Sequence, residues 1–357
     1  MDINDYLSHL VEKGGSDLHL KVGGPAFVRI DGDLHPVDHL PALTAEDTEA
    51  FAHAIMGQAS RERAARGEEA DFAYSMPGTG RFRVAVFYQR GSLGLVVRRV
   101  LPGSQSFGEL GLPAAVRRLS EEHRGLALVT GPTGSGKTTT TAAMISHINA
   151  TRSCHIVTIE DPIEILHSDQ KAIVDQREVG VDTADFNSAL RSVARQDPDV
   201  IFVGEMRDVE TVTAALQAAE TGHFVISTLH TTNTTETLNR IIDMFPPHQQ
   251  YQTRLSLANS LKGIVCQRLL PSATGGRVAA VEVFVMTARL HEFVLDPAKT
   301  GEIEDAIAGG EYYGMQTFDQ HLLELYRDNR VTLKDALAAA TSPHDLRIAV
   351  RAAGLQA

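Results

Sequence analysis

The middle of the chain alternates short, continuous apolar runs with stretches that have a helical pattern. The apolar runs are GLALVTG, CHIVTIED, DVIFVGE, GHFVISTLH and VAAVEVFVM. Continuous apolar strands separated by helices are typical of a parallel sheet that is covered on both faces. We therefore predict an α/β core over residues 114–286, followed by a region of short helices over residues 287–357.

The first hundred residues have a different pattern. The segment DLHLKVGGPAFVRIDGDLHPV alternates apolar and polar positions around Gly23-Gly24 and Asp31-Gly32, which predicts a hairpin. Two helical patterns follow, TAEDTEAFAHAIM and QASRERAARG, and then strands broken by glycine-rich turns. We predict a small α/β domain over residues 1–100. Residues 101–113 contain two prolines and three glycines, which indicates a linker.

Composition narrows the class of protein. The chain has 357 residues, of which 43% are hydrophobic, enough for two or more domains with their own cores. A formal net charge of -12 argues against a nucleic-acid partner, because binding a phosphate backbone needs a basic face. The start, MDINDYLSHL, is unlike a signal peptide, and no apolar run approaches the length of a membrane span. We expect a cytoplasmic protein without direct membrane insertion.

One loop carries a specific chemical signal. The segment GPTGSGKTT satisfies the pattern G-x-x-x-x-G-K-[ST] between an apolar strand and a helical stretch. Such a loop aims backbone N–H groups at phosphate oxygens, its Lys reaches the β- and γ-phosphates, and the hydroxyl that follows binds Mg²⁺. We predict an ATP and Mg²⁺ site formed by Gly131, Pro132, Thr133, Gly134, Ser135, Gly136, Lys137, Thr138 and Thr139, with Thr138 as the metal ligand.

Acidic residues follow two of the other strands, and ligands of parallel sheets bind at the carboxyl ends of strands. Glu205 comes directly after DVIFVG, where a carboxylate can polarise the attacking water or hold Mg²⁺ through a water molecule. Glu160 and Glu164 lie at the end of CHIVTIEDPIE. For these two acids, positioning of water, an indirect contact with the metal and a solvated acidic turn all stay open.

Two histidines border the strand GHFVISTLH. His223 lies at its start and His230 at its end. A shared zinc ion is disfavoured, because seven residues of extended strand separate the two side chains by roughly 20 Å or more. A buried, hydrogen-bonded histidine is the ordinary interpretation, and a γ-phosphate sensor is the alternative for His230.

Together these segments carry a family resemblance. GPTGSGKTTT, IVTIEDPIE, DPDVIFVGEMRDVET and ETGHFVISTLHTTN resemble, in order, the Walker A, Asp, Walker B and His boxes of the type II/IV secretion ATPase superfamily. GGSDLHLKVGGPAFVRIDGDL, RFRVAVFYQRGSLGLVVRRV, GRVAAVEVFV and GGEYYGMQTFDQHL are similar to the pilus-retraction (PilT-type) branch of that superfamily. The resemblance covers nearly the whole chain.

The resemblance implies a homohexameric ring that hydrolyses ATP to retract type IV pili. Each subunit would join a PAS-like N-terminal domain to a RecA-like ATPase domain, and the ring would act on an inner-membrane platform protein, with a paralogous ATPase as a further partner. The implied catalytic residues are Glu205 as the base, Glu160 and Glu164 as the Asp-box acids, His223 and His230 as the His-box residues, and Arg81, Arg83 and Arg98 as candidates for an arginine that completes a neighbouring site.

Three other functions compete with retraction. Pilus assembly and type II secretion ATPases of the same superfamily have a longer N-terminal region and a four-cysteine zinc insertion, whereas this chain holds only Cys154 and Cys266. A nucleotide-binding accessory subunit with little turnover is the second alternative, and the intact Glu205 argues against it. A translocase that moves along nucleic acid is disfavoured by the acidic balance of the chain.

Overall fold

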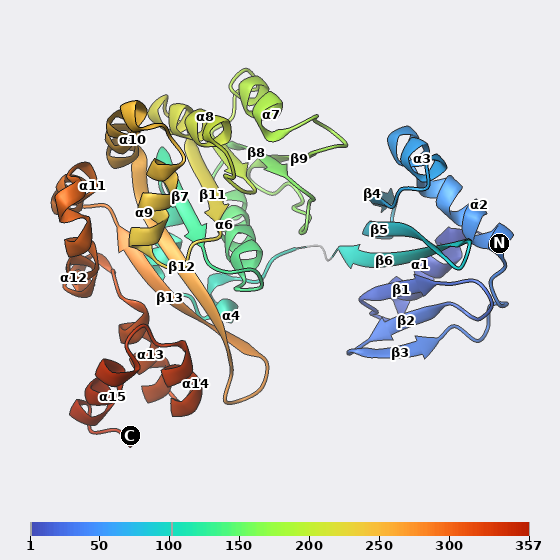
Figure 1. Cartoon of the computed structure of the whole chain (residues 1–357). Helices are drawn as coiled ribbons and strands as arrows, with labels where there is room; N and C mark the ends of the chain where they lie inside the picture. Colours follow the sequence, from blue (N-terminus) through green and yellow to red (C-terminus); the bar gives the residue numbers. More distant parts are fainter. Residues whose placement is uncertain (1, 101–102, 357) are drawn as a thin grey trace. The chain divides into compact units, whose positions relative to one another are not determined.

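The computed structural model describes residues 2–100 and 103–356, which form two compact units (Figure 1). The first unit comprises Met1–Gly103 with the short segment Glu164–Leu166, and the second comprises Ser104–Ile163 with His167–Ala357. Of the predicted linker over residues 101–113, positions 101–102 lie outside the described residues. Part of the remainder is helical, because α4 spans Phe107–Leu110.

The first unit is built on a six-stranded antiparallel sheet with the strand order β3-β2-β1-β6-β5-β4. Buried apolar residues such as Leu18, Val28, Val84 and Val97 share one core cluster with residues of α1 and α2. Its elements are α1 (Ile3–Glu12), β1 (Asp17–Leu20), β2 (Phe27–Ile30), β3 (Asp33–Pro36), α2 (Ala45–Ile55), α3 (Gln58–Ala65), β4 (Ala70–Met76), β5 (Gly80–Gln89) and β6 (Ser92–Val100).

The predicted hairpin at Asp31-Gly32 is present. Ile30 pairs with Asp33, so the turn between β2 and β3 has two residues. Both have positive φ, 51° at Asp31 and 98° at Gly32, the conformation that a tight two-residue turn needs and that Asp and Gly tolerate best. The small α/β fold expected for the start of the chain is therefore confirmed.

The second unit is built on a seven-stranded sheet with the order β13-β12-β7-β11-β10-β8-β9, in which only β13 is antiparallel to its neighbour. Its strands are β7 (Gly125–Thr130), β8 (His155–Glu160), β9 (Ile173–Glu178), β10 (Val200–Val203), β11 (Phe224–Leu229), β12 (Leu261–Pro271) and β13 (Arg277–Val285). Its α-helices are α4, α5 (Ala114–Ser120), α6 (Lys137–Thr151), α7 (Phe186–Val193), α8 (Val209–Glu220), α9 (Thr234–Asp243), α10 (Pro247–Ser260), α11 (Ala288–Leu295), α12 (Ile303–Ala308), α13 (Phe318–Arg327), α14 (Leu333–Ala339) and α15 (Pro343–Ala352), and its short 3-10 helices are η1 (Pro297–Glu302) and η2 (Glu311–Tyr313).

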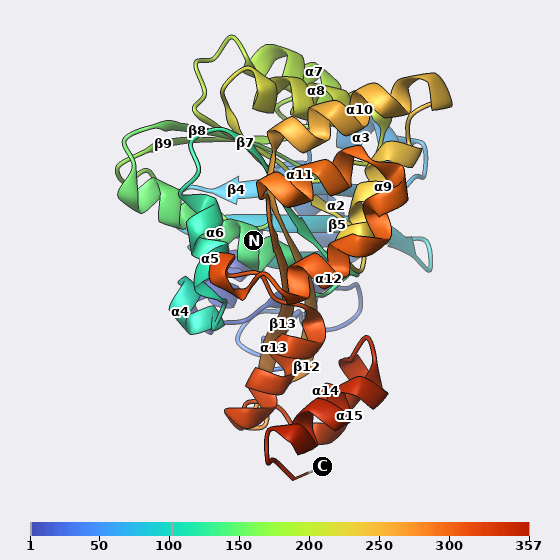
Figure 2. The ribbon, with the colours of Figure 1, turned by 90° about the vertical axis from the view of Figure 1, so that its left-hand side faces the viewer.

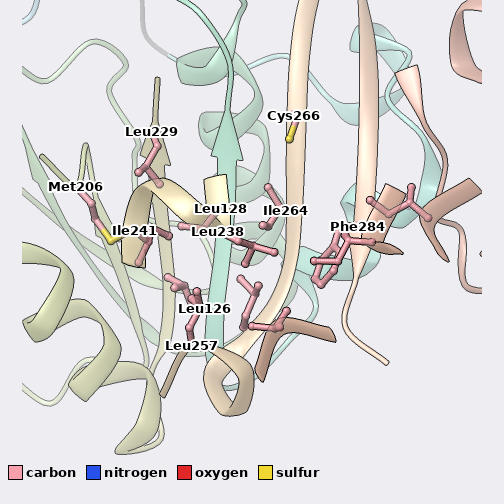
Figure 3. Packing of buried hydrophobic residues seen from close by; sticks show 14 of the residues in the cluster. Leu126, Leu128, Met206, Leu229, Leu238, Ile241, Leu257, Ile264, Cys266 and Phe284 are labelled. Carbon is pink, nitrogen blue, oxygen red and sulfur yellow. The ribbon is translucent and has the colours of Figure 1, made fainter. Parts of the chain in front are cut away.

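Helices cover both faces of this sheet, as the continuous apolar runs predict. On one face, Leu126 and Leu128 of β7 pack with Leu238 and Ile241 of α9 and with residues of α10 (Figure 3). On the other face, alternate residues of the same strands pack with α5 and α6. Figure 2 shows α5 and α6 on one side of the sheet and α9 to α11 on the other.

The strand VAAVEVFVM departs from the prediction. It forms β13, which runs antiparallel to β12 rather than parallel to the core strands. The physical reason is the connection, because only residues 272–276 separate the two strands and a parallel pair needs a crossover of a dozen residues or more. The strands β9 and β12 were not among the predicted runs.

The helical region that begins near residue 287 agrees with the prediction, since α11 to α15 follow β13. Within residues 2–100 and 103–356, no helix has both the length and the apolar character that a bilayer crossing requires.

Candidate active site

The register of the second sheet brings the ends of four neighbouring strands together. Thr130, the last residue of β7, pairs with Leu229 of β11, and Val203 of β10 pairs with both Ser227 of β11 and Ile159 of β8. The residues that follow these strands therefore lie along one edge of the sheet. They include the glycine-rich loop, His230, Glu205 and Glu160.

The glycine-rich loop connects β7 to α6, which begins at Lys137. Gly131, Gly134 and Gly136 have φ values of 148°, 79° and 90°, which side chains rarely allow. The loop is also tight, because a Cβ at Gly131 would lie 2.5 Å from the Ser135 hydroxyl. The hydroxyl of Ser135 is buried and has no hydrogen-bond partner among the described residues.

Lys137 lies over this loop and connects it to the next strand. Its Nζ is 2.7 Å from the carbonyl oxygen of Gly131 and 3.1 Å from that of Pro132, and it is 3.3 Å from Nδ1 of His230. An ammonium can only donate, so Nδ1 accepts and the proton of a neutral His230 lies on Nε2. That nitrogen is 3.4 Å from Oε1 of Glu205. Lys137, His230 and Glu205 thus form one continuous line of polar contacts.

Glu205 has a second partner that the sequence analysis missed. Nη2 of Arg207 lies 2.8 Å from Oε2 of Glu205, so each carboxylate oxygen of Glu205 faces a different side chain. The hydrogen bond to Glu205 raises the pKa of the Arg207 guanidinium. The segment GEMRD contains the signal that could have identified Arg207, since a cation two residues beyond a carboxylate can turn back towards it.

The loop that carries His230 is held by a buried carboxylate. Glu282 of β13 is 4% exposed, and its Oε1 accepts hydrogen bonds from the backbone N–H (2.8 Å) and the hydroxyl (2.7 Å) of Thr234, the first residue of α9. Burial raises the pKa of Glu282. These contacts hold the start of α9 against the sheet, four residues beyond His230, and so restrict where the imidazole can lie.

The two acids of the Asp box occupy different surroundings. Glu160 ends β8 and is 8% exposed, and its Oε1 accepts hydrogen bonds from the hydroxyl of Thr158 (2.7 Å) and the amide of Gln176 (3.0 Å). Glu164 is exposed and groups with the first unit. Of these two acids, Glu160 is therefore the one that lies with Glu205 and His230 at the carboxyl ends of the strands in the second unit.

His223 lies at the other edge of the sheet. It precedes β11, whose first residue, Phe224, pairs with Gly125 at the start of β7. Its Nδ1 is 2.9 Å from the carbonyl oxygen of Ala218 at the end of α8. The structure therefore brings His230 to the glycine-rich loop and places His223 at the opposite end of the same strand.

The candidate arginines belong to the sheet of the first unit. Arg83 on β5 pairs across the sheet with Arg98 on β6, and both side chains are exposed. Arg98 makes an ion pair of 2.9 Å with Asp17 of β1, and Arg81 donates to the hydroxyl of Ser75 at 3.2 Å. Arg83 and Arg98 thus present cations on one face of this sheet.

Comparison with known proteins agrees with this arrangement. The chain is 42% identical over 345 residues to the type IV pilus retraction ATPase PilT of Pseudomonas aeruginosa, covering 97% of this chain and 100% of the relative. It is also 42% identical to the type IV pilus ATPase PilU of the same organism, over 98% of this chain and 92% of that protein. A crystal structure of the pilus retraction motor PilT with bound ADP matches with a TM-score of 0.88 and 45% identity, over 98% of this chain and 99% of that chain.

The resemblance inferred from the four sequence boxes is thereby confirmed, together with the predicted fold of an N-terminal domain, a RecA-like ATPase domain and a helical C-terminal part. The family model for Type II/IV secretion system protein matches residues 1–310. The chain therefore belongs to the Type II/IV secretion system protein family.

Proposed function

We propose that this chain is an ATPase motor that powers the retraction of type IV pili. The observation that carries the proposal is the line of contacts from Lys137 through His230 to Glu205, because it joins the group that binds phosphate to the group that activates water. The choice of retraction over assembly rests on the similarity, over the whole length of the chain, to a protein named as a pilus retraction ATPase.

In this proposal the second unit binds ATP at the loop between β7 and α6. Backbone N–H groups of the loop and the N-terminus of α6 face the phosphates, and Lys137 turns from the Gly131 and Pro132 carbonyls to the β- and γ-oxygens. The fully charged phosphate oxygens compete well for an ammonium that otherwise rests on neutral carbonyls. The buried Ser135 hydroxyl provides a further polar contact in the loop.

Hydrolysis then follows from the position of Glu205. A water molecule attacks the γ-phosphorus and gives its proton to Glu205, while the bond from phosphorus to the bridging oxygen breaks and ADP leaves with that electron pair. Each carboxylate oxygen has two lone pairs, so Glu205 can accept the proton of the water while its contacts with His230 and Arg207 orient it.

Mg²⁺ belongs to this proposal as well. The hydroxyl of Thr138 in the first turn of α6 would hold the ion, which withdraws charge from the phosphate oxygens when bound. In residues 2–100 and 103–356 no cluster of three or more His, Cys, Asp or Glu residues forms a metal site of its own.

We also propose that the motor is a homohexamer at the cytoplasmic face of the inner membrane, where it acts on the pilus platform protein. Within such a ring, Arg81, Arg83 and Arg98 are candidates to complete a nucleotide site, since a guanidinium can neutralise the charge that develops in phosphoryl transfer. A paralogous ATPase is a further candidate partner, in keeping with the similarity to PilU.

Two measurements test the proposal. The purified chain is expected to release phosphate from ATP, and an accessory subunit without turnover would not. Deletion of the gene in its own cells is expected to leave an excess of surface pili and to abolish twitching. Cells that lose their pili instead would show that the chain drives assembly, and cells with unchanged pili and movement would contradict both roles.

A further inference from the structure

A buried amide side chain lies directly against the glycine-rich loop. Gln267 of β12 is 2% exposed, and its Oε1 accepts a hydrogen bond of 2.8 Å from the hydroxyl of Thr140, which is 1% exposed. Thr140 is the fourth residue of α6, and its backbone N–H donates to the carbonyl oxygen of Gly136 at 3.0 Å. The loop, the first turn of α6 and β12 are therefore connected through two residues.

The two outer glycines of the loop both lie on Gln267. A Cβ added at Gly131 would come within 2.4 Å of the backbone carbonyl oxygen of Gln267, and one added at Gly136 would come within 2.7 Å of its side-chain Nε2. Neither position therefore has room for a side chain, so both glycines pack directly against β12. The Gln267 side chain thus packs against the loop at Gly136, where α6 begins, and the backbone of the same residue packs against Gly131 at the start of the loop.

A polar residue at this position stands out against the rest of the strand. Cys266, the preceding residue, points into the apolar cluster on the α9 side of the sheet (Figure 3). Gln267 points to the α6 side, where its strand neighbours Val265 and Leu269 belong to the apolar cluster. Burying an amide among apolar side chains costs free energy unless its hydrogen bonds are made, and here the partner is a helix that begins at the phosphate-binding Lys.

We propose that Gln267 is a positioning residue for nucleotide binding. It holds the glycine-rich loop and the first turn of α6 in the shape that aims the backbone N–H groups and Lys137 at the phosphates. The physical reason is preorganisation, because a loop already held in its bound shape loses less conformational freedom when the nucleotide arrives. This inference rests on nucleotide binding at the loop, as set out in the proposed function.

The test measures ADP affinity by calorimetry on the full chain, with Mg²⁺ present. Gln267→Met replaces the amide by an apolar group of similar size, and Thr140→Val replaces the hydroxyl by a methyl group. Each is expected to weaken ADP binding about tenfold, the effect of losing one hydrogen bond. The double variant is expected to bind no more weakly than either single variant, because both remove the same bond.

Asn149→Leu is the matched control. Asn149 lies near the other end of α6, is 1% exposed, donates to the carbonyl oxygen of Ser168 at 2.8 Å and accepts from the Gln170 N–H at 3.1 Å. This variant is expected to lower the melting temperature while leaving ADP affinity unchanged. A merely structural role for Gln267 would make the two variants alike.

The proposal is overturned if Gln267→Met binds ADP like the unmodified chain, or if Asn149→Leu weakens binding to the same degree. It is also overturned if the effects of Gln267→Met and Thr140→Val multiply in the double variant. If Gln267→Met fails to fold, the ADP affinity of Thr140→Val alone tests the proposal, because that substitution only replaces the hydroxyl oxygen by a methyl group. If the unmodified chain binds no ADP, the proposed function itself is wrong, which is a different result.

Discussion

The ammonium of Lys137 contacts two carbonyl oxygens of the glycine-rich loop and Nδ1 of His230. We expect these contacts to change when a phosphate arrives. A carbonyl oxygen carries only a partial charge, whereas a γ-phosphate oxygen is ionised and forms stronger hydrogen bonds. Arrival of ATP would therefore draw Lys137 away from the loop. His230 would then lose its contact with the ammonium, and its other nitrogen faces Glu205.

The first prediction concerns Lys137→Ala. Hydrolysis is expected to fall by at least about 10²-fold, because the charge that opposes the β- and γ-oxygens is lost. Phosphate release measures the effect, and a native circular dichroism spectrum shows that the fold is intact. Lys334→Ala, on the exposed surface of α14, is the control and should hydrolyse ATP normally. Near-normal turnover of Lys137→Ala would contradict the assignment of the loop.

The second prediction separates binding from chemistry. Glu205→Gln retains the size of the side chain but not the base, so ATP should still bind while hydrolysis falls roughly 10²-fold or more. Binding is measured by calorimetry and turnover by phosphate release. The same change at Glu210, an exposed residue in the first turn of α8, should affect neither. Unchanged turnover, or loss of ATP binding, in Glu205→Gln would refute its role as the base.

At the scale of elements, β12 and β13 hold the helices that border the site. Gln267 of β12 contacts α6 on one face of the sheet, and Glu282 of β13 contacts α9 on the other. A third buried contact connects β13 to the C-terminal helices. Nδ1 of His321 on α13 accepts a hydrogen bond of 2.9 Å from the backbone N–H of Val281 on β13. These polar contacts specify which helix faces which strand.

The contact between α13 and β13 is expected to depend on pH. Burial, with a smaller contribution from Arg330, lowers the pKa of His321 from 6.5 to about 4. A histidine whose pKa is lower in the folded state stabilises the fold above its unfolded pKa. This stabilisation is lost as the pH falls from about 6.5 towards 4, and it amounts to at most about 3 kcal/mol.

Hydrogen exchange at the Val281 amide measures this effect, because that N–H donates to His321. After correction for the intrinsic exchange rate, its opening free energy should decrease between pH 7 and pH 4.5. In His321→Gln, which retains an acceptor but does not titrate in this range, the decrease should be absent or much smaller. An equal pH dependence in the two proteins would show that His321 is not the group responsible.

At the scale of the whole molecule, the proposed catalytic side chains and the candidate arginines belong to different compact units. Lys137, Glu205 and His230 lie in the second unit, whereas Arg81, Arg83 and Arg98 lie in the first. An arginine of the first unit could complete a site in its own subunit or in a neighbour. A ring motor favours the neighbour, because each site then senses the state of the adjacent subunit.

Mixing two inactive variants tests the shared site. In a hexamer formed from the Arg81→Ala, Arg83→Ala double variant and from Lys137→Ala, some junctions pair an intact loop with intact arginines. Hydrolysis should therefore return, since an arginine supplied by a neighbour contributes about 10³-fold or more to phosphoryl transfer. Capture of one variant by a tag on the other must first show that they assemble together. Mixed rings without activity would refute the shared site.

The sequence by itself determined much of this protein. Continuous apolar runs predicted five strands of the second sheet, and the spacing of Gly131, Gly136 and Lys137 predicted a phosphate site, because both signals lie within a few consecutive residues. Strand direction also indicated which acids lie at the carboxyl ends. Local periodicity and turn chemistry are properties of short segments, so they can be read without knowing which segments become neighbours.

Only the tertiary structure decided which side chains meet. Lys137 and His230 are 93 residues apart, and Thr140 and Gln267 are 127 apart, yet each pair is in contact because β7 lies between β11 and β12. Strand order leaves no periodic trace in the sequence, which is why Gln267 and Glu282 escaped notice. The direction of β13 was missed because β12, to which a short turn joins it, was not among the predicted strands. The turn of Arg207 onto Glu205 likewise depends on how the chain leaves β10, and the contacts around that loop settle it.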